Sequence, residues 1–134
     1  MSPDPQTLEQ ALEAAQKAIA LNDSLPWGHM ALGHVHLWQK QPEQARAETE
    51  RAITLDPNEA WSYAALAEVL SCGGRPEDAV GMVEQALSRK PIVTDWHLGS
   101  VSTAYYLARR SEEALAPVKQ FLTQIGRASC RERV

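Results

Sequence analysis

Residues 18–23 read AIALND, and residues 52–57 read AITLDP, 34 positions further along the chain. Self-similarity at a fixed period of about 20–50 residues is the signature of a repeat architecture. Shifting the chain on itself by 34 residues superposes further identical residues, namely Trp27 on Trp61, Leu32 on Leu66, Ala45 on Ala79, Ala52 on Ala86 and Pro57 on Pro91.

Further copies extend this pattern in both directions. A third copy follows at a shift of 35 residues and places Trp61 on Trp96. Upstream, Ala45 aligns with Ala11, so the chain opens with the second half of a repeat. The sequence therefore predicts one solenoid domain over residues 5–124, with a leading helix over 5–22 and repeats over about 26–59, 60–94 and 95–124.

Each copy is predicted to contain two helices. In the second copy, apolar residues recur at helical spacing in two stripes, separated by the glycine pair at 73–74. Paired glycines end a helix, and Pro76 suits the first turn of the next one. Pro57 and Pro91 disfavour helical geometry at the residues before them, which ends each second helix. Two helices and two turns therefore fill about 34 residues.

Small residues recur where the two helices of a copy are expected to cross. Small side chains allow helix axes to approach to the short end of the range of about 8–10 Å. They stand midway along each first helix and near the start of each second helix, at Gly33, Ala67 and Ser102 and at Ala45, Ala79 and Ala114.

The period, the large–small pairs Leu32-Gly33 and Leu66-Ala67, and the closing prolines resemble the tetratricopeptide repeat family. The resemblance covers about residues 6–123. It implies an all-α, right-handed α–α superhelix of seven helices, three helix–turn–helix repeats plus one leading helix. A narrower resemblance, carried by residues 37–87, is to the C-terminal repeat arrays of bacterial adenylate/guanylate cyclases and related signalling proteins.

Composition excludes several classes of function. The net charge of −4 argues against nucleic-acid binding, which needs a basic face. No apolar run reaches the roughly 18 residues that a membrane span needs, and the N-terminus lacks the pattern of a signal peptide. Two cysteines make a poor disulfide framework. We therefore expect a cytoplasmic protein that contacts neither nucleic acid nor membrane, and the narrower resemblance implies a bacterial one.

The last ten residues, IGRASCRERV at 125–134, lack a helical period. Read as ATC GGA AGA GCG TCG TGT AGG GAA AGA GTG, they resemble an in-frame translation of a common sequencing adapter. We therefore expect this segment to be non-native and the chain to be a fragment of a longer protein; the alternative is a natural, disordered tail. Without its three arginines and Glu132, the chain of 13 basic and 17 acidic residues keeps 10 and 16, a net charge of −6.

By the family resemblance, the first helix of each repeat lines the inner, concave face of the solenoid. The indoles of its first turn then form a row of three. This row is open to two interpretations: aromatic anchors for a bound peptide or helix, or packing against the preceding helix pair. The implied groove positions are Trp27, Met30, His34, Leu37 and Trp38, then Trp61, Ala64, Glu68, Ser71 and Cys72, then Trp96, Gly99, Thr103, Tyr106 and Leu107.

The groove positions argue against other kinds of site. Family members that clamp a terminal carboxylate need lysine, arginine and asparagine there, and none of the implied positions holds one. His29, His34, His36 and His97 lack the spacing of a structural zinc site, and no phosphate loop or acid–base pair points to catalysis. We expect no metal and no cofactor, and interpret Cys72 as a packing residue.

These observations predict a non-catalytic scaffold that binds a protein or peptide on its concave face. The alternative is a regulatory or oligomerisation segment of a larger signalling enzyme, such as an adenylate/guanylate cyclase. The apolar stripe of the first helix and the uncapped last helix leave both ends of the array open. We therefore expect further repeats in the parent chain, or self-association through the open ends.

Overall fold

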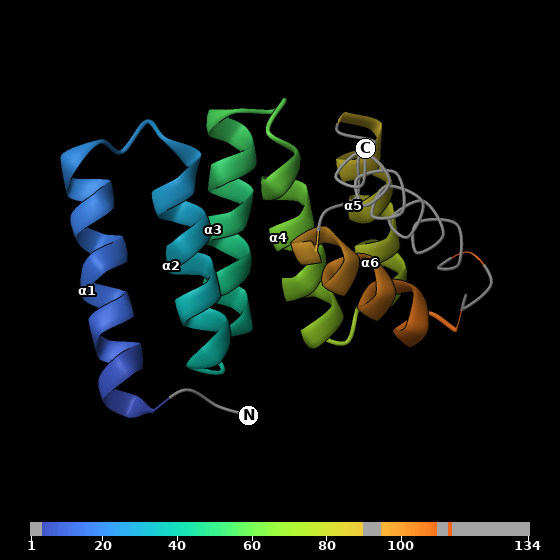
Figure 1. The fold of residues 1–134 in the computed structure, drawn as a ribbon, viewed down its shortest axis with the longest axis horizontal. Coiled ribbons are helices and arrows are strands. Elements are labelled where there is room, and N and C mark those ends of the chain that lie inside the picture. Colours follow the sequence, from blue (N-terminus) through green and yellow to red (C-terminus); the bar gives the residue numbers. More distant parts are fainter. Residues whose placement is uncertain (1–3, 90–94, 110–112, 114–134) are drawn as a thin grey trace, which may run out of the picture.

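Six helices follow one another along the part of the chain that the computed structural model describes, which is residues 4–89, 95–109 and 113. Residues 95–100 are described as backbone only. The seventh predicted helix, Ala114 and the segment 125–134 lie outside the described residues. The helices are α1 (Pro5–Leu21), α2 (Pro26–Trp38), α3 (Pro42–Leu55), α4 (Ala60–Cys72), α5 (Pro76–Arg89) and α6 (Asp95–Leu107) (Figure 1).

Local sequence explains where these helices begin. Helices α1, α2, α3 and α5 each start at a proline, whose fixed φ suits the first turn and whose missing N–H has no partner there anyway. Helix α4 has no such proline. Instead, the carboxylate of Glu59 accepts a hydrogen bond of 3.1 Å from the backbone N–H of Trp61, which caps the helix.

The turn after the first helix of each repeat keeps one backbone geometry. Lys40, Gly74 and Arg109 occupy equivalent positions and all have positive φ, at 60°, 78° and 59°. The N–H of the next residue then bonds to the carbonyl five residues back, from Gln41 to His36 and from Arg75 to Leu70, both at 2.9 Å. This is the bond that closes a helix through a left-handed residue. The repeat is therefore present in the backbone conformation as well as in the amino-acid sequence.

Only one of these three left-handed positions carries glycine, so the other two hold a strained side chain. Changing Lys40 to glycine should raise the free energy of unfolding by roughly 1 kcal/mol, because the left-handed conformation costs an L-residue about 1–2 kcal/mol. Urea unfolding followed by circular dichroism measures this. The reverse change, Gly74→Ala, should lower stability, and equal stabilities for Lys40→Gly and the parent protein would contradict the expectation.

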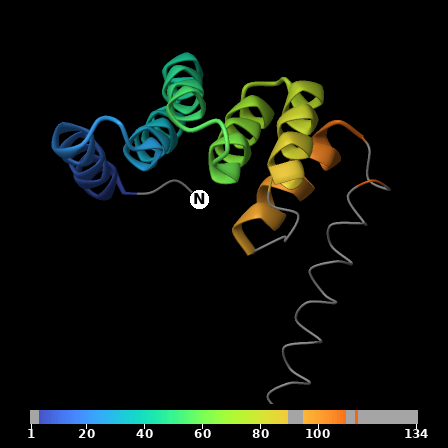
Figure 2. The same ribbon diagram turned by 90° about the horizontal axis from the view of Figure 1, so that it is seen from above.

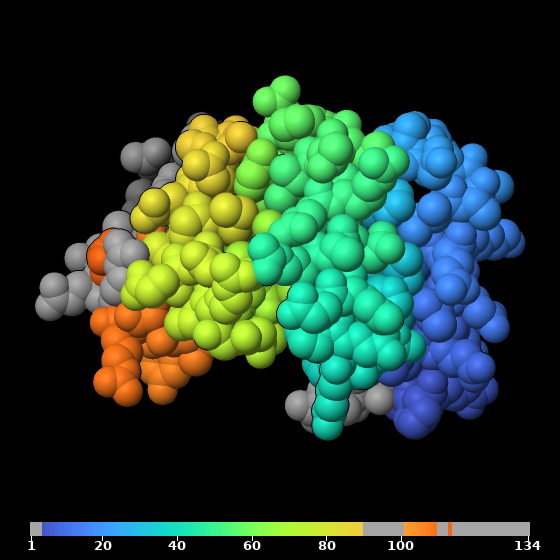
Figure 3. Space-filling model, turned by 180° about the vertical axis from the view of Figure 1, so that it is seen from behind, coloured from blue at the N-terminus to red at the C-terminus, as the bar shows by residue number. Residues whose placement is uncertain are grey.

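The helices form two layers that curve. Helix α2 packs against α4 and α4 against α6, whereas in the described part of the chain no Cα atom of α3 lies within 8 Å of one in α5. Seen from above, α2, α4 and α6 follow the lower side of the arch, and α3 and α5 lie above them (Figure 2). The view from behind shows α3 and α5 covering the opposite surface (Figure 3). We call the surface of α2, α4 and α6, flanked by α1, the inner face.

The main core joins the second repeat to α6. Leu66 on α4 packs with Val80 and Val83 on α5 and with Val101 and Tyr105 on α6, and all five are buried. A second cluster joins the first two repeats, because Met30 of α2 and Ala52 of α3 meet Ala65 and Trp61 of α4. Each repeat therefore completes its core on its neighbour, as in an all-α solenoid of helix–turn–helix units.

The predicted close crossing is confirmed in the first repeat. A Cβ atom added to Gly33 would lie 2.8 Å from Cγ2 of Thr49 and 3.2 Å from the carbonyl oxygen of Ala45. In the second repeat, Ala67 and Ala79 are both completely buried. Ser102, the third member of the series, is only half-buried, so its small size is not required by burial in the described structure.

Candidate protein-interaction face

Two indoles of the predicted tryptophan row touch on the inner face. The ring centroids of Trp27 and Trp61 lie 6.3 Å apart, with their planes tilted by 48°. Trp27 is 51% exposed, whereas Trp61 is partly buried against the cluster that contains Met30. Trp27 is therefore mainly a surface residue, whereas Trp61 also contributes to the packing between the first two repeats. The side chain of Trp96 lies outside the described residues.

A hollow of about 400 Å³ opens between α2 and α4 beside these indoles. We call it the Trp61 pocket. Its walls are almost wholly apolar, because indole rings and short aliphatic side chains supply most of them. It is lined by Trp27, Met30, Ala31, His34 and Trp61.

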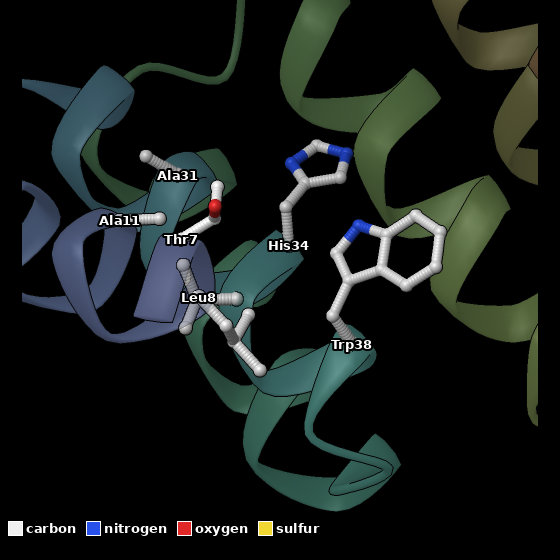
Figure 4. A pocket seen from close by; sticks show the side chains of 7 residues that line it. Thr7, Leu8, Ala11, Ala31, His34 and Trp38 are labelled. Atoms are coloured by element: carbon white, nitrogen blue, oxygen red, sulfur yellow. The ribbon is translucent and has the colours of Figure 1, made fainter. Parts of the chain in front are cut away.

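A second hollow, of about 330 Å³, lies on the other side of α2, where α1 approaches it. We call it the Trp38 pocket, and Figure 4 shows the α1 side chains on one side of it and His34 and Trp38 on the other. The two pockets share Ala31 and His34, so they adjoin across one turn of α2. The second is lined by Thr7, Leu8, Ala11, Ala31, His34, Val35 and Trp38.

The shared residue His34 is held by two acceptors. Its Nδ1 lies 3.0 Å from the carbonyl oxygen of Met30, and its Nε2 lies 3.2 Å from Oε2 of Glu68 on α4. A carbonyl and a carboxylate can only accept, so both ring nitrogens are best used as donors, which requires the imidazolium form. The hydrogen bond to Glu68 accordingly raises the pKa of His34 above its ordinary value of 6.5, against the opposing effect of burial.

His34 adds a titratable group to implied groove positions that hold no lysine or arginine. The raised pKa keeps His34 charged to higher pH than a histidine in water. Its charge is directed at Glu68, however, rather than presented to a ligand. A terminal carboxylate would therefore have to compete with Glu68 for His34.

The raised pKa of His34 predicts a pH-dependent stability. Because the folded pKa lies above the unfolded value of 6.5, the stabilising contribution is complete below that pH and is lost as pH rises through the folded pKa. The free energy of unfolding should therefore fall as the pH rises above about 6.5, until the pH has passed the raised, folded pKa of His34. In His34→Gln, which keeps a neutral polar group, this part of the decline should disappear. Urea unfolding at several pH values measures it, and parallel curves for both proteins would contradict it.

Other predicted groove residues divide into exposed and buried ones. Tyr106 is 72% exposed, Leu107 and Thr103 are exposed, and Leu37 is half-buried, although none of these lines either pocket. The backbone of Gly99 lies in α6.

Ala64 and Ser71 require correction as groove residues. Ala64 is only 2% exposed and belongs to a cluster with Tyr63 and Ala86, so it lies under the surface rather than on it. Ser71 is 5% exposed, and its Oγ has no hydrogen-bond partner among the described residues. Ala64 packs with Ala86 of α5, in the other layer, and Ser71 is buried, so neither side chain forms part of the inner surface.

No metal or nucleophilic site emerges in the described ranges. No three side chains of His, Cys, Asp or Glu gather there closely enough to hold a metal ion. His29 bonds Glu48 at 2.7 Å, and His36 faces the amide oxygen of Gln39 at 3.1 Å. Cys72 is exposed, so its interpretation as a packing residue was wrong. Partial desolvation and the nearby Glu68 raise the pKa of its thiol, which disfavours the reactive thiolate. None of the described helices is long and apolar enough to cross a membrane.

Sequence reasoning missed the contribution of α1 to the inner face. Leu8 and Ala11 were interpreted as the packing stripe of an open end, whereas both line the Trp38 pocket together with Thr7. The sequence pattern of the leading helix does not say which of its sides faces α2. Gly28 could have supplied this information, because a Cβ added there would lie 2.9 Å from Cγ1 of Ile19, which marks the close approach of α1.

Comparisons with known proteins agree with this architecture. A model of the tetratricopeptide repeat family matches residues 49–81, from the second half of α3 to the first half of α5. The crystal structure of MamA is similar, with a TM-score of 0.69 and 22% sequence identity over 91% of this chain and 71% of that chain. At this identity the likeness is one of fold. None of the curated proteins compared with the chain matches it.

Proposed function

We propose that this chain, a tetratricopeptide repeat protein, is a non-catalytic scaffold that binds a peptide or helix in the two pockets of its inner face. One observation supports the proposal above all. The Trp61 and Trp38 pockets lie next to each other, because Ala31 and His34 line both of them. Exposed indoles beside apolar hollows are the anchors that dominate protein interfaces, because they bury a large area at a small entropic cost.

The wall shared by the pockets offers the sharpest test. Ala31 is exposed and lines both pockets, so Ala31→Gln should fill them without disturbing the core. Ala47→Gln makes the same chemical change at an exposed site on α3, in the other layer. Random peptides displayed on phage are first selected for binding to the unaltered chain.

Affinities of the selected peptides are then measured by fluorescence anisotropy. Ala31→Gln should weaken binding about tenfold or more, because a centrally placed contact is worth roughly 1–2 kcal/mol or more, and Ala47→Gln should change nothing. Equal affinities for the two variants, or the selection of no peptide, would refute binding on the inner face.

A second candidate function is the regulatory or oligomerisation segment of a larger signalling enzyme. Two leucines at the α1–α2 turn favour it, since Leu21 is 78% exposed and Leu25 is 50% exposed at the first end of the array. Large exposed aliphatic side chains at the end of a solenoid suit a further repeat or a second copy. Sedimentation velocity distinguishes the candidates, because self-association through this end would make the chain's mass depend on its concentration.

A further inference from the structure

The chemistry of the pocket walls favours a helical occupant over an extended one. An extended peptide presents unpaired backbone N–H and C=O groups along its length, and each needs a partner once it is buried. The walls offer mainly aliphatic and aromatic atoms, with Thr7 and His34 as the polar exceptions apart from the indole N–H groups. A helix satisfies its backbone internally, so it can lie in such a groove without loss of hydrogen bonds.

The spacing of the pockets fixes the pattern of apolar residues on such a helix. The pockets lie on either side of α2, so their centres are separated by about one interhelical distance, roughly 8–10 Å. Residues seven apart on a helix lie about 10.5 Å apart on one face. The residue three or four positions along the same face falls midway, over the wall that Ala31 and His34 share.

A carboxylate paired with His34 borders that midpoint, and only one of its two oxygens is used in the pair. The side chain of Glu68 is 36% exposed, and its carboxylate oxygen Oε2 accepts a hydrogen bond from His34. Its Oε1 has no hydrogen-bond partner among the described residues. Among the described residues, neither pocket is lined by lysine or arginine. In that part of the chain, a cation arriving at the midpoint therefore shares the Glu68 carboxylate with His34 alone.

Resting on the function proposed above, we infer that the occupant is an amphipathic helix of a partner protein. It carries apolar side chains seven residues apart, one for each pocket, and a lysine or arginine between them that bonds to Glu68. Such charge-assisted bonds add selectivity to an otherwise apolar interface.

The test compares three full-length chains: unaltered, Glu68→Gln and Glu43→Gln. Glu43 is an exposed carboxylate on α3, so it controls for the loss of one negative charge. Phage-displayed random peptides of about 16 residues, long enough for four helical turns, are selected on each chain. The unaltered chain and Glu43→Gln should enrich a basic residue midway between apolar residues seven apart, and Glu68→Gln should enrich only the apolar pair.

One selected peptide then supplies the quantitative readout. Changing its basic residue to glutamine should weaken binding to the unaltered chain about threefold to tenfold and leave binding to Glu68→Gln unchanged. Circular dichroism should show the peptide becoming helical as it binds. An equal loss on both chains, or an extended bound peptide, overturns the inference while leaving the proposed function intact.

Two other outcomes are decisive. Peptides whose affinity does not respond to Ala31→Gln refute the proposed function, and the inference fails with it. A dimer of the chain that Ala31→Gln dissociates would make a second copy the occupant, and would overturn the inference alone.

Discussion

The Leu66→Ala protein is expected to lose about 2–5 kcal/mol of unfolding free energy, the usual cost of truncating a buried leucine. Leu66 is 5% exposed and packs with residues of α5 and α6, including Val83 and Tyr105, so its loss leaves a cavity where two repeats meet. Since domains are stable by only about 5–15 kcal/mol, this single change should shift the urea midpoint strongly.

A matched control separates the cavity from the chemistry of the substitution. Leu21→Ala removes the same atoms from a side chain that is 78% exposed, so it should change the stability by no more than about 0.5 kcal/mol. Unfolding is followed by circular dichroism in urea for both variants. Equal midpoints would contradict the role of Leu66 as the link between the second repeat and α6.

The second large effect concerns binding. Trp61→Ala should weaken the affinity for a selected peptide by about 2 kcal/mol or more, roughly thirtyfold, because the indole walls one pocket and contacts Trp27. The change also removes packing against Met30 and Ala65, so the melting curve must accompany the binding curve. Binding is measured below the melting transition of the variant.

Tyr106→Ala is the matched control for this effect. It truncates another aromatic side chain of the inner face, 72% exposed on α6, that lines neither pocket. Its effect on affinity should be several times smaller than that of Trp61→Ala. A larger loss from Tyr106→Ala would move the binding surface towards α6.

The helical repeat could be predicted from sequence because its causes are local. Prolines at the first helical position and the stripe of apolar residues in each helix act within one or two turns, so they leave a direct record in the letters. The small residues also predicted one tertiary contact. The close approach of the two helices at Gly33 and Ala45 is confirmed. Lysine itself gives no hint of the positive φ at Lys40, so this turn could be predicted only by transferring Gly74 across the shift of 34 residues.

The candidate site was only partly predictable. The family resemblance placed Trp27, His34 and Trp61 on one surface, and all three line the Trp61 pocket. It also placed Ala64 there, whereas Ala64 is buried against Ala86 of α5. The bond from His34 to Glu68 and the wall supplied by α1 depend on how neighbouring helices are placed, which no single-helix pattern encodes.

The central claim is that the two pockets between α1, α2 and α4 receive the partner. Nuclear magnetic resonance tests it most directly, because each of the four tryptophans gives one indole N–H signal. On addition of a selected peptide, the signals of Trp27, Trp38 and Trp61 should all shift, while the amides of the exposed residues of α3 stay in place. Unmoved indole signals together with shifted amides on α3 and α5 would contradict the account.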